Sequence, residues 1–303
     1  MKVWMNGEFV DLDKANVSIF SHSFGRGSAV FEVFDIVSTE KGPAFFGLNQ
    51  HIDRLFKSAE LVYMDLPLSR DEIIKACIRT AKENNVAMGA AKLFAYYSGI
   101  EFTAIPQNPQ VDIAIFCVDY NAFGIKQEDL SAPVDVGISS YKKYHPDTVP
   151  VHAKVTGNYV NPYLAMMEMK KKGYEDVIII DVFGNVSEGA TSSLFTVKDD
   201  KIQTAKLNNV LNGITRMAVI EVVKDMDMQI EETDIKPEEL YDLDEAFYSV
   251  SLEHIKPIKS IEEKKLGSVC PGPTTQKVID AMNDLYSGNN KKSKNWLIYI
   301  NGR

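Results

Sequence analysis

Two stretches decide how this chain is interpreted. Residues 151–159 are Val-His-Ala-Lys-Val-Thr-Gly-Asn-Tyr, and residues 184–190 are Gly-Asn-Val-Ser-Glu-Gly-Ala. The first places one lysine, Lys154, among apolar and turn-forming neighbours, and the second places Glu188 in what we predict to be a loop. A lysine attacks a carbonyl carbon only when its surroundings favour the neutral amine. We therefore take this lysine and this carboxylate as the leading candidates for chemistry, although most lysines in proteins are simply solvated.

Composition limits the class of protein. Of the 303 residues, 45% are hydrophobic, and 33 Lys and Arg stand against 42 Asp and Glu for a formal net charge of −9. Such a chain can bury the cores of two domains, and its charge argues against a nucleic-acid partner. There is no apolar leader and no run of about eighteen apolar residues, so we expect a cytoplasmic protein with no membrane partner. The three cysteines are far apart and the five histidines lack paired ligand spacing, so no disulfide framework and no metal site are expected.

The first half of the chain has the pattern of a small α+β domain, residues 1–120. Residues 3–10 alternate around Asn6-Gly7, which is a strong hairpin signal. A helix from Asn49 has the buried stripe Ile52, Leu55, Phe56 and Ala59, and Arg54 lies outside that stripe. We expect further strands at 29–37, 43–46, 91–97 and 111–118 and a helix at 70–84. Residues 121–133 have neither helical nor strand periodicity and are the expected interdomain linker.

The remaining residues, 134–303, have the pattern of a larger domain. Strands are expected at 134–139, 177–181, 193–198 and 201–204 and near Ile230 and Ala246. Helices are expected from Asn158, at 214–226 and at 274–285. For the first of these helices the apolar spacing predicts a buried stripe of Val160, Tyr163, Leu164 and Met167.

Residues 212–216, Asn-Gly-Ile-Thr-Arg, place a glycine and a hydroxyl at the start of a predicted helix. Unpaired backbone N–H groups and the helix dipole favour an anion at such a place, so it is a candidate phosphate site. An ordinary helix cap has the same pattern. Spacing alone does not decide between these two interpretations.

Taken together, residues 153–159, 184–189 and 213–216 resemble the class IV aminotransferases and, more narrowly, the branched-chain amino acid aminotransferases. The motifs Asn-Gly-Glu at 6–8, His-Ile-Asp-Arg-Leu at 51–55 and Gly-Pro at 272–273 extend the resemblance over nearly the whole chain. It implies an α/β protein of pyridoxal phosphate (PLP) fold type IV, like D-amino acid aminotransferase. The N-terminal domain would be α+β and the large C-terminal, cofactor-binding domain a pseudo-barrel. It also implies pyridoxal 5'-phosphate as cofactor and a homodimer or higher homo-oligomer.

The resemblance also implies roles for individual residues. Lys154 would bind the cofactor covalently and act as the catalytic base, and Glu188 would pair with the pyridine nitrogen. Tyr159 would contact the phenolic oxygen; without the family it is equally a core tyrosine. The phosphate would be held by Arg54, Ile214, Thr215 and Ser251. Val250 stands where the family has a glycine before that last hydroxyl.

The substrate side departs from the branched-chain pattern. Arg26 replaces a tyrosine, Val33 a glycine, and residues 90–93 a Tyr-Ile-Arg-Pro strand. Arg26 and Lys92 are candidate carboxylate ligands or surface charges, and Phe31 and Tyr96 line either a substrate pocket or the core. The implied reaction moves an amino group between an amino acid, a branched-chain L-amino acid first, and a 2-oxo acid such as 2-oxoglutarate. The alternatives are a D-amino acid transaminase, an aminodeoxychorismate lyase and a non-catalytic PLP-binding protein.

Overall fold

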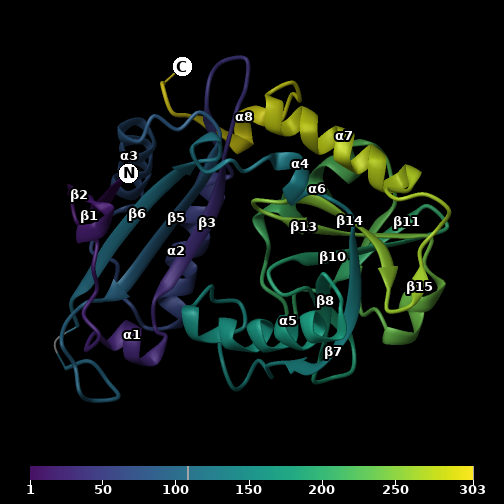
Figure 1. The fold of residues 1–303 in the computed structure, drawn as a ribbon, viewed down its shortest axis with the longest axis horizontal. Helices are drawn as coiled ribbons and strands as arrows, with labels where there is room; N and C mark the ends of the chain where they lie inside the picture. The colour runs from purple at the N-terminus through teal and green to yellow at the C-terminus, as the bar shows by residue number, and fades with distance from the viewer. Residues whose placement is uncertain (108, 303) are drawn as a thin grey trace. The chain divides into compact units, whose positions relative to one another are not determined.

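The chain divides into two compact units in the computed structural model, which describes residues 1–107 and 109–302 (Figure 1). Unit 1 consists of Met1–Lys126, Ala153–Asn158 and Leu285–Arg303, and unit 2 of Gln127–His152 and Tyr159–Asp284. Each unit has its own sheet and its own hydrophobic core. Lys154 therefore belongs to unit 1, whereas Glu188 belongs to unit 2.

Unit 1 contains a seven-stranded antiparallel sheet in the order β16-β4-β3-β5-β6-β1-β2. Its central strands pair Phe31 with Phe94 and Val33 with Lys92, so these four side chains lie on one face. Glu32 points to the opposite face. The strands are β1 (Lys2–Met5), β2 (Glu8–Asp11), β3 (Val30–Val37), β4 (Ala44–Phe46), β5 (Gly89–Tyr97), β6 (Val111–Asp119) and β16 (Leu297–Tyr299).

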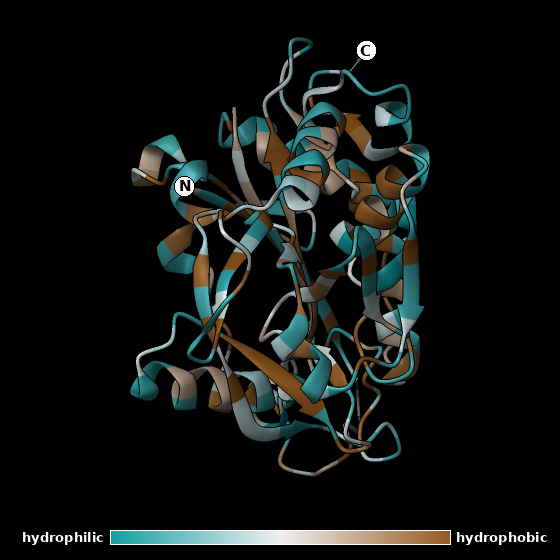
Figure 2. Ribbon diagram, turned by 90° about the vertical axis from the view of Figure 1, so that its right-hand side faces the viewer, coloured by the Kyte–Doolittle hydropathy of each residue, from teal (hydrophilic) through white to brown (hydrophobic). Residues whose placement is uncertain are grey.

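Two helices cover this sheet, α2 (Leu48–Leu61) on β3 and α3 (Arg70–Glu83) on β6. The predicted stripe of α2 is confirmed for Ile52, Leu55 and Ala59, which are buried; Phe56 is half-buried and packs against the same core. Figure 2 colours the ribbon by hydropathy, and its helices contain both hydrophilic and hydrophobic residues. The shorter helices here are η1 (Leu12–Lys14), α1 (His22–Arg26), η2 (Asn121–Phe123) and α8 (Ser293–Trp296).

The predicted N-terminal hairpin is confirmed. Met5 pairs with Glu8, and the turn residues Asn6 and Gly7 both have positive φ, 49° and 104°. Asparagine and glycine are the residues that adopt this backbone most readily, which is why this dipeptide closes hairpins. The other strands and the second helix expected in this half are also confirmed, with small shifts at their ends.

Unit 2 contains a nine-stranded sheet, in which β12-β11-β10-β13-β14-β7-β8-β9 form the path and β15 pairs with β14. The pairs β7·β8, β7·β14 and β11·β12 are parallel. The N–H of Val186 in β9 donates to the carbonyl of Ile235, just after β12, at 2.8 Å. The two ends of the sheet therefore meet, which confirms the expected pseudo-barrel. The strands are β7 (Val134–Lys143), β8 (Asp176–Asp181), β9 (Val186–Glu188), β10 (Ser193–Lys198), β11 (Lys201–Ala205), β12 (Ile230–Thr233), β13 (Glu245–Val250), β14 (His254–Ile261) and β15 (Lys264–Lys265).

The stripe predicted for the first helix of this half is wrong. Helix α5 (Val160–Lys172) exposes all four of the expected residues, Val160 and Tyr163 by more than half. It buries Ala165 and Met169 against the apolar residues of β8 instead. Apolar side chains occur on two sides of α5, so periodicity alone did not select the buried one. The other helices are α4 (Gln127–Leu130), η3 (Thr156–Tyr159), α6 (Ile214–Asp225), η4 (Pro237–Asp242) and α7 (Pro273–Ser287).

Two further expectations about local structure are corrected. Glu188 does not lie in a loop but is the last residue of β9, a three-residue strand too short to show an alternating pattern. Residues 121–133, expected to lack regular structure, contain η2 and α4. Strand β7 continues to Lys143, past the predicted end at Ser139 and beyond a register irregularity.

Candidate active site

The segment that carries Lys154 is fixed to unit 1 by backbone hydrogen bonds. The Lys154 carbonyl accepts from Phe31 N at 3.0 Å, and its own N–H donates to Ser58 Oγ at 3.0 Å. Gly157 N donates to the carbonyl of Gly27 at 2.7 Å. A Cβ on Gly27, whose φ is +65°, would lie 2.9 Å from Gly157 Cα, so this close approach requires glycine. The main chain of Lys154 is thus held on both sides.

The Lys154 side chain shares an aromatic surface with a second lysine. Its Nζ lies 4.9 Å from the ring centroid of Phe31, and Lys92 Nζ lies 5.3 Å from the same centroid. Burial, and then the charge of Lys154, lower the pKa of Lys92. The structure therefore brings together three of the predicted residues, one catalytic and two on the substrate side.

Arg54 lies outside the apolar stripe of α2, yet its side chain is largely buried. Its Nε and Nη2 donate to the two carboxylate oxygens of Glu32 at 2.8 and 2.6 Å, and His51 Nδ1 lies 2.7 Å from Oε2. Burial acts to raise the pKa of Glu32, but Arg54 and then His51 outweigh it, and the pKa falls to about 2. Burial lowers the pKa of His51 to about 4, so the imidazole is neutral at neutral pH. A buried, ionised carboxylate thus orients the guanidinium.

The other two substrate-side candidates lie in different surroundings. Arg26, at the end of α1, is exposed, and its Nη1 donates to the carbonyl of Gly25 at 3.3 Å. Tyr96 is buried and lines an apolar cavity of about 470 Å³ together with Phe94 and Phe116. Burial, and then Asp112, raise the pKa of Tyr96 to about 12, so its hydroxyl stays protonated.

In unit 2, the buried carboxylate of Glu188 is held by two partners. Lys143 forms an ion pair with its Oε1, and Leu211 N donates to Oε2 at 3.3 Å. Lys143 was not predicted. It is the last residue of β7, which starts at Val134 as expected but is longer than predicted, so a longer predicted strand would have included it. The ion pair and the backbone hydrogen bond hold the carboxylate in one position, where it is available to accept a hydrogen bond from a further donor.

The start of helix α6 fits a phosphate group. Gly213 is its N-cap and provides no side-chain cap, while Ile214 and Thr215 are buried. A Cβ on Gly213 would lie 2.9 Å from Ser193 Oγ, so a larger residue here would require the Ser193 side chain to shift. Ser249 pairs with Ser193 across the strands, and its buried Oγ has no hydrogen-bond partner in the described part of the chain. Uncapped N–H groups and an unpartnered hydroxyl are what a phosphate requires.

The remaining predicted cofactor residues are both half-buried in unit 2. Tyr159 is the N-cap residue of α5, and Ser251 lies in the tight turn where Val250 pairs with His254. Within residues 1–107 and 109–302, no helix is long and apolar enough to cross a membrane. The same residues contain no group of three or more His, Cys, Asp or Glu that could hold a metal ion.

Comparison with known proteins identifies the family to which the chain belongs. Residues 29–261 match the family model "Amino-transferase class IV". The chain therefore belongs to this family of transaminases. The sequence resemblance is thereby confirmed.

Individual relatives carry a narrower name. The branched-chain-amino-acid aminotransferase of Escherichia coli (strain K12) is 31% identical over 301 residues, which cover 99% of this chain and 97% of that protein. A crystal structure of the branched-chain aminotransferase from Thermoproteus uzoniensis with norvaline has a TM-score of 0.93 and 30% identity, covering 99% of both chains. The branched-chain amino acid aminotransferase from Thermobaculum terrenum, solved in its PLP form, has a TM-score of 0.91 and 25% identity, covering 99% of this chain and 98% of that one. The structural relatives therefore include an enzyme solved with PLP.

Proposed function

We propose that this chain is a PLP-dependent aminotransferase that moves an amino group between a branched-chain L-amino acid and a 2-oxo acid such as 2-oxoglutarate. Membership of the class IV family is the observation that carries the proposal, and the named activity of full-length relatives supports the substrate class. The proposal includes a cytoplasmic homodimer or higher homo-oligomer. It also includes the functional division into residues 1–120, a linker at 121–133, and residues 134–303.

The residues present fit PLP. Arg54, Ile214, Thr215 and Ser251 would hold its phosphate, and the uncapped start of α6 supports that assignment. Tyr159 would donate to its phenolic oxygen, and Glu188 would accept a hydrogen bond from its pyridine nitrogen. When bound, PLP supplies an electron-withdrawing ring that takes up electron density from the substrate α-carbon.

The catalytic work of this chain falls to Lys154. Its side-chain amine would hold PLP covalently and would also act as the base that removes the proton from the substrate α-carbon. The backbone bonds from Phe31 and to Ser58 limit the positions this amine can reach. Glu188, held in place by its ion pair with Lys143, would hold a proton at the pyridine nitrogen.

Substrate recognition would fall to Arg26, Phe31, Lys92 and Tyr96. An amine near the Phe31 ring is suited to a substrate carboxylate, since a charge-assisted hydrogen bond there is partly desolvated. The apolar surfaces of Phe31 and Tyr96 are suited to a branched aliphatic side chain.

A substrate panel tests the proposal. Protein saturated with PLP is mixed with L-leucine, L-valine, D-alanine or D-glutamate, and loss of the visible absorbance of the bound cofactor is followed before and after addition of 2-oxoglutarate. We expect bleaching by the L-amino acids and recovery with the 2-oxo acid. Bleaching by D-amino acids alone would replace the substrate assignment with that of a D-amino acid transaminase. Visible absorbance without bleaching by any amino acid would contradict the aminotransferase activity itself.

A further inference from the structure

Helix α2 presents three polar side chains toward β3 and the segment that carries Lys154. His51, Arg54 and Ser58 follow one another at spacings of three and four residues, so they lie along one side of the helix. All three side chains are largely buried, with exposed fractions of 2% for His51, 9% for Arg54 and 0% for Ser58. A helix buries polar side chains at low cost only where they have hydrogen-bond partners.

The partner of two of these side chains is Glu32 of β3. Its Oε1 accepts from Arg54 Nε at 2.8 Å, and its Oε2 accepts from Arg54 Nη2 at 2.6 Å. His51 Nδ1 lies 2.7 Å from the same Oε2. A guanidinium is a rigid fork, so fixing its Nε and Nη2 edge also fixes the direction of the N–H groups on its other edge. Glu32 therefore determines where Arg54 can bind an anion.

The main chain of Lys154 is held by the same two elements. Ser58 Oγ of α2 accepts from Lys154 N, and Phe31 N of β3 donates to the Lys154 carbonyl, both at 3.0 Å. Phe31 is the residue before Glu32 in β3, and Ser58 lies one turn beyond Arg54 in α2. The contact of Glu32 with Arg54 thus joins β3 to α2 beside the two bonds that hold Lys154.

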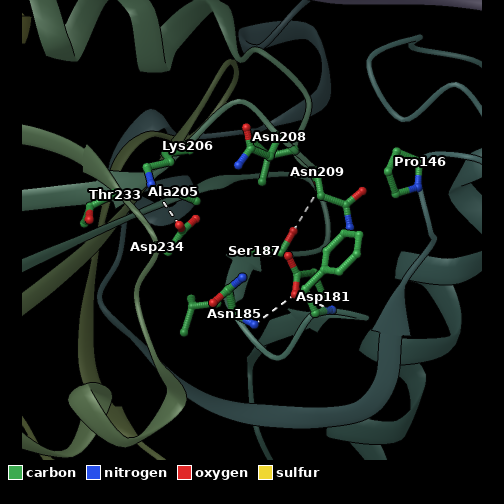
Figure 3. A pocket seen from close by; sticks show the side chains of 13 residues that line it. Pro146, Asp181, Asn185, Ser187, Ala205, Lys206, Asn208, Asn209, Thr233 and Asp234 are labelled. Atoms are coloured by element: carbon green, nitrogen blue, oxygen red, sulfur yellow. Dashed lines mark hydrogen bonds and ion pairs between the residues drawn. The ribbon is translucent and has the colours of Figure 1, made fainter.

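A surface ion pair of unit 2 shows how different this arrangement is. Beside a cavity of about 330 Å³, Lys206 and Asp234 form an ion pair of 2.8 Å, but each side chain is 45% exposed (Figure 3). Such pairs add little stability, and their side chains can rearrange in water. Glu32 and Arg54 are 0% and 9% exposed, so their geometry is fixed, and removing either one leaves a buried charge without its partner.

We propose that Glu32 is a positioning residue, which sets the direction and the distance between the Arg54 guanidinium and the Lys154 amine. This inference rests on the proposed function, in which Arg54 binds the phosphate of PLP and Lys154 binds its aldehyde. Both groups are attached to one rigid pyridine ring. A single cofactor molecule therefore reaches both residues only when their spacing is correct. Glu32 is fully buried and acts through Arg54.

A comparison of PLP with pyridoxal, which lacks the phosphate, tests this role. The two molecules share the ring and the aldehyde, so the ratio of their dissociation constants reports the contribution of the phosphate, whereas a general loosening of the fold weakens both alike. Both constants are measured by equilibrium dialysis on the cofactor-free full chain. In Glu32→Gln we expect the preference for PLP to fall at least about tenfold. Glu60→Gln, at an exposed residue of α2 paired with Lys57, is the matched control and should keep it.

A second substitution tests whether Glu32 acts through Arg54. In Arg54→Met the preference for PLP should already be lost, so adding Glu32→Gln should lower it by no more than about twofold. The double variant removes both charges of the pair, so neither is left buried without a partner. A further tenfold loss in that background, or an unchanged preference in Glu32→Gln alone, would overturn the proposal.

Arg54→Lys provides the test if Glu32→Gln does not fold. Lysine keeps a positive charge beside Glu32 but has no second edge, so the preference for PLP should fall at least about tenfold, and an unchanged preference would overturn the proposal. A wild type that does not prefer PLP over pyridoxal would contradict the proposed PLP function and this inference with it. A wild-type preference that Glu32→Gln retains would contradict this inference alone.

Discussion

The buried group of Glu32, His51 and Arg54 predicts how stability depends on pH. The free energy of unfolding should begin to fall at a pH well above the range in which ordinary carboxylates titrate. Burial moves the pKa of His51 from 6.5 to about 4 on folding. Between these two values the unfolded chain binds a proton that the folded chain does not, so the free energy of unfolding falls as the pH falls. At about 1.4 kcal/mol per pKa unit, His51 removes about 2 kcal/mol between pH 8 and pH 5. Glu32, with a pKa lowered to about 2, stabilises the fold above its unfolded pKa of 4.5 and loses that contribution only at lower pH.

The assay is urea unfolding at a series of pH values between 8 and 5, followed by tryptophan fluorescence. Both tryptophans, Trp4 and Trp296, belong to unit 1, so the signal reports the unit that contains His51. The matched control is His51→Gln, which keeps a donor for Glu32 but does not titrate. We expect the wild type to lose about 2 kcal/mol more than this variant across the range. Equal pH dependence in the two proteins would refute the reasoning.

Three further predictions follow from the site. Lys143→Met leaves the buried Glu188 carboxylate without its ion-pair partner, so the cofactor-free protein should melt at a lower temperature than the wild type. Added PLP should raise the melting temperature of the variant more than that of the wild type. Equal increases in differential scanning fluorimetry would contradict this. Gly27→Ala forces a Cβ to within 2.9 Å of Gly157 Cα at a φ of +65°, and should cost about 1–3 kcal/mol of stability and displace Lys154. The control Gly25→Ala meets nothing within 4 Å and should be tolerated, and equal melting temperatures of the two variants would disprove the strain. Lys92→Met should raise the Michaelis constant for a dicarboxylic 2-oxo acid about tenfold more than that for a monocarboxylic one, and equal changes would remove Lys92 from carboxylate binding.

Long elements with one regular pattern were predictable from the sequence. The α2 stripe and the Asn6-Gly7 hairpin are examples, because a single period or a single turn type determines each. Helix α5 was predictable as a helix but not in its orientation. The apolar spacing selected the side that is exposed, whereas packing against β8 determines which side is buried.

Site residues that belong to a local sequence motif were predictable. Site residues that depend on a contact formed by folding were not. Lys154 and the start of α6 come from local motifs. The ion pair of Lys143 with Glu188 and the burial of Arg54 beside Glu32 join residues far apart in the chain. From the sequence pattern alone, each of these charged side chains is expected to be exposed. The pattern does not show the oppositely charged partner that offsets the free-energy cost of burying the charge.

The central claim is that Lys154 is the residue that binds PLP. Protein saturated with the cofactor is reduced with borohydride, digested, and mapped by mass spectrometry. We predict one phosphopyridoxyl adduct, on Lys154, and none in Lys154→Ala treated in the same way. An adduct on Lys92, or on any other lysine in place of Lys154, would contradict the account.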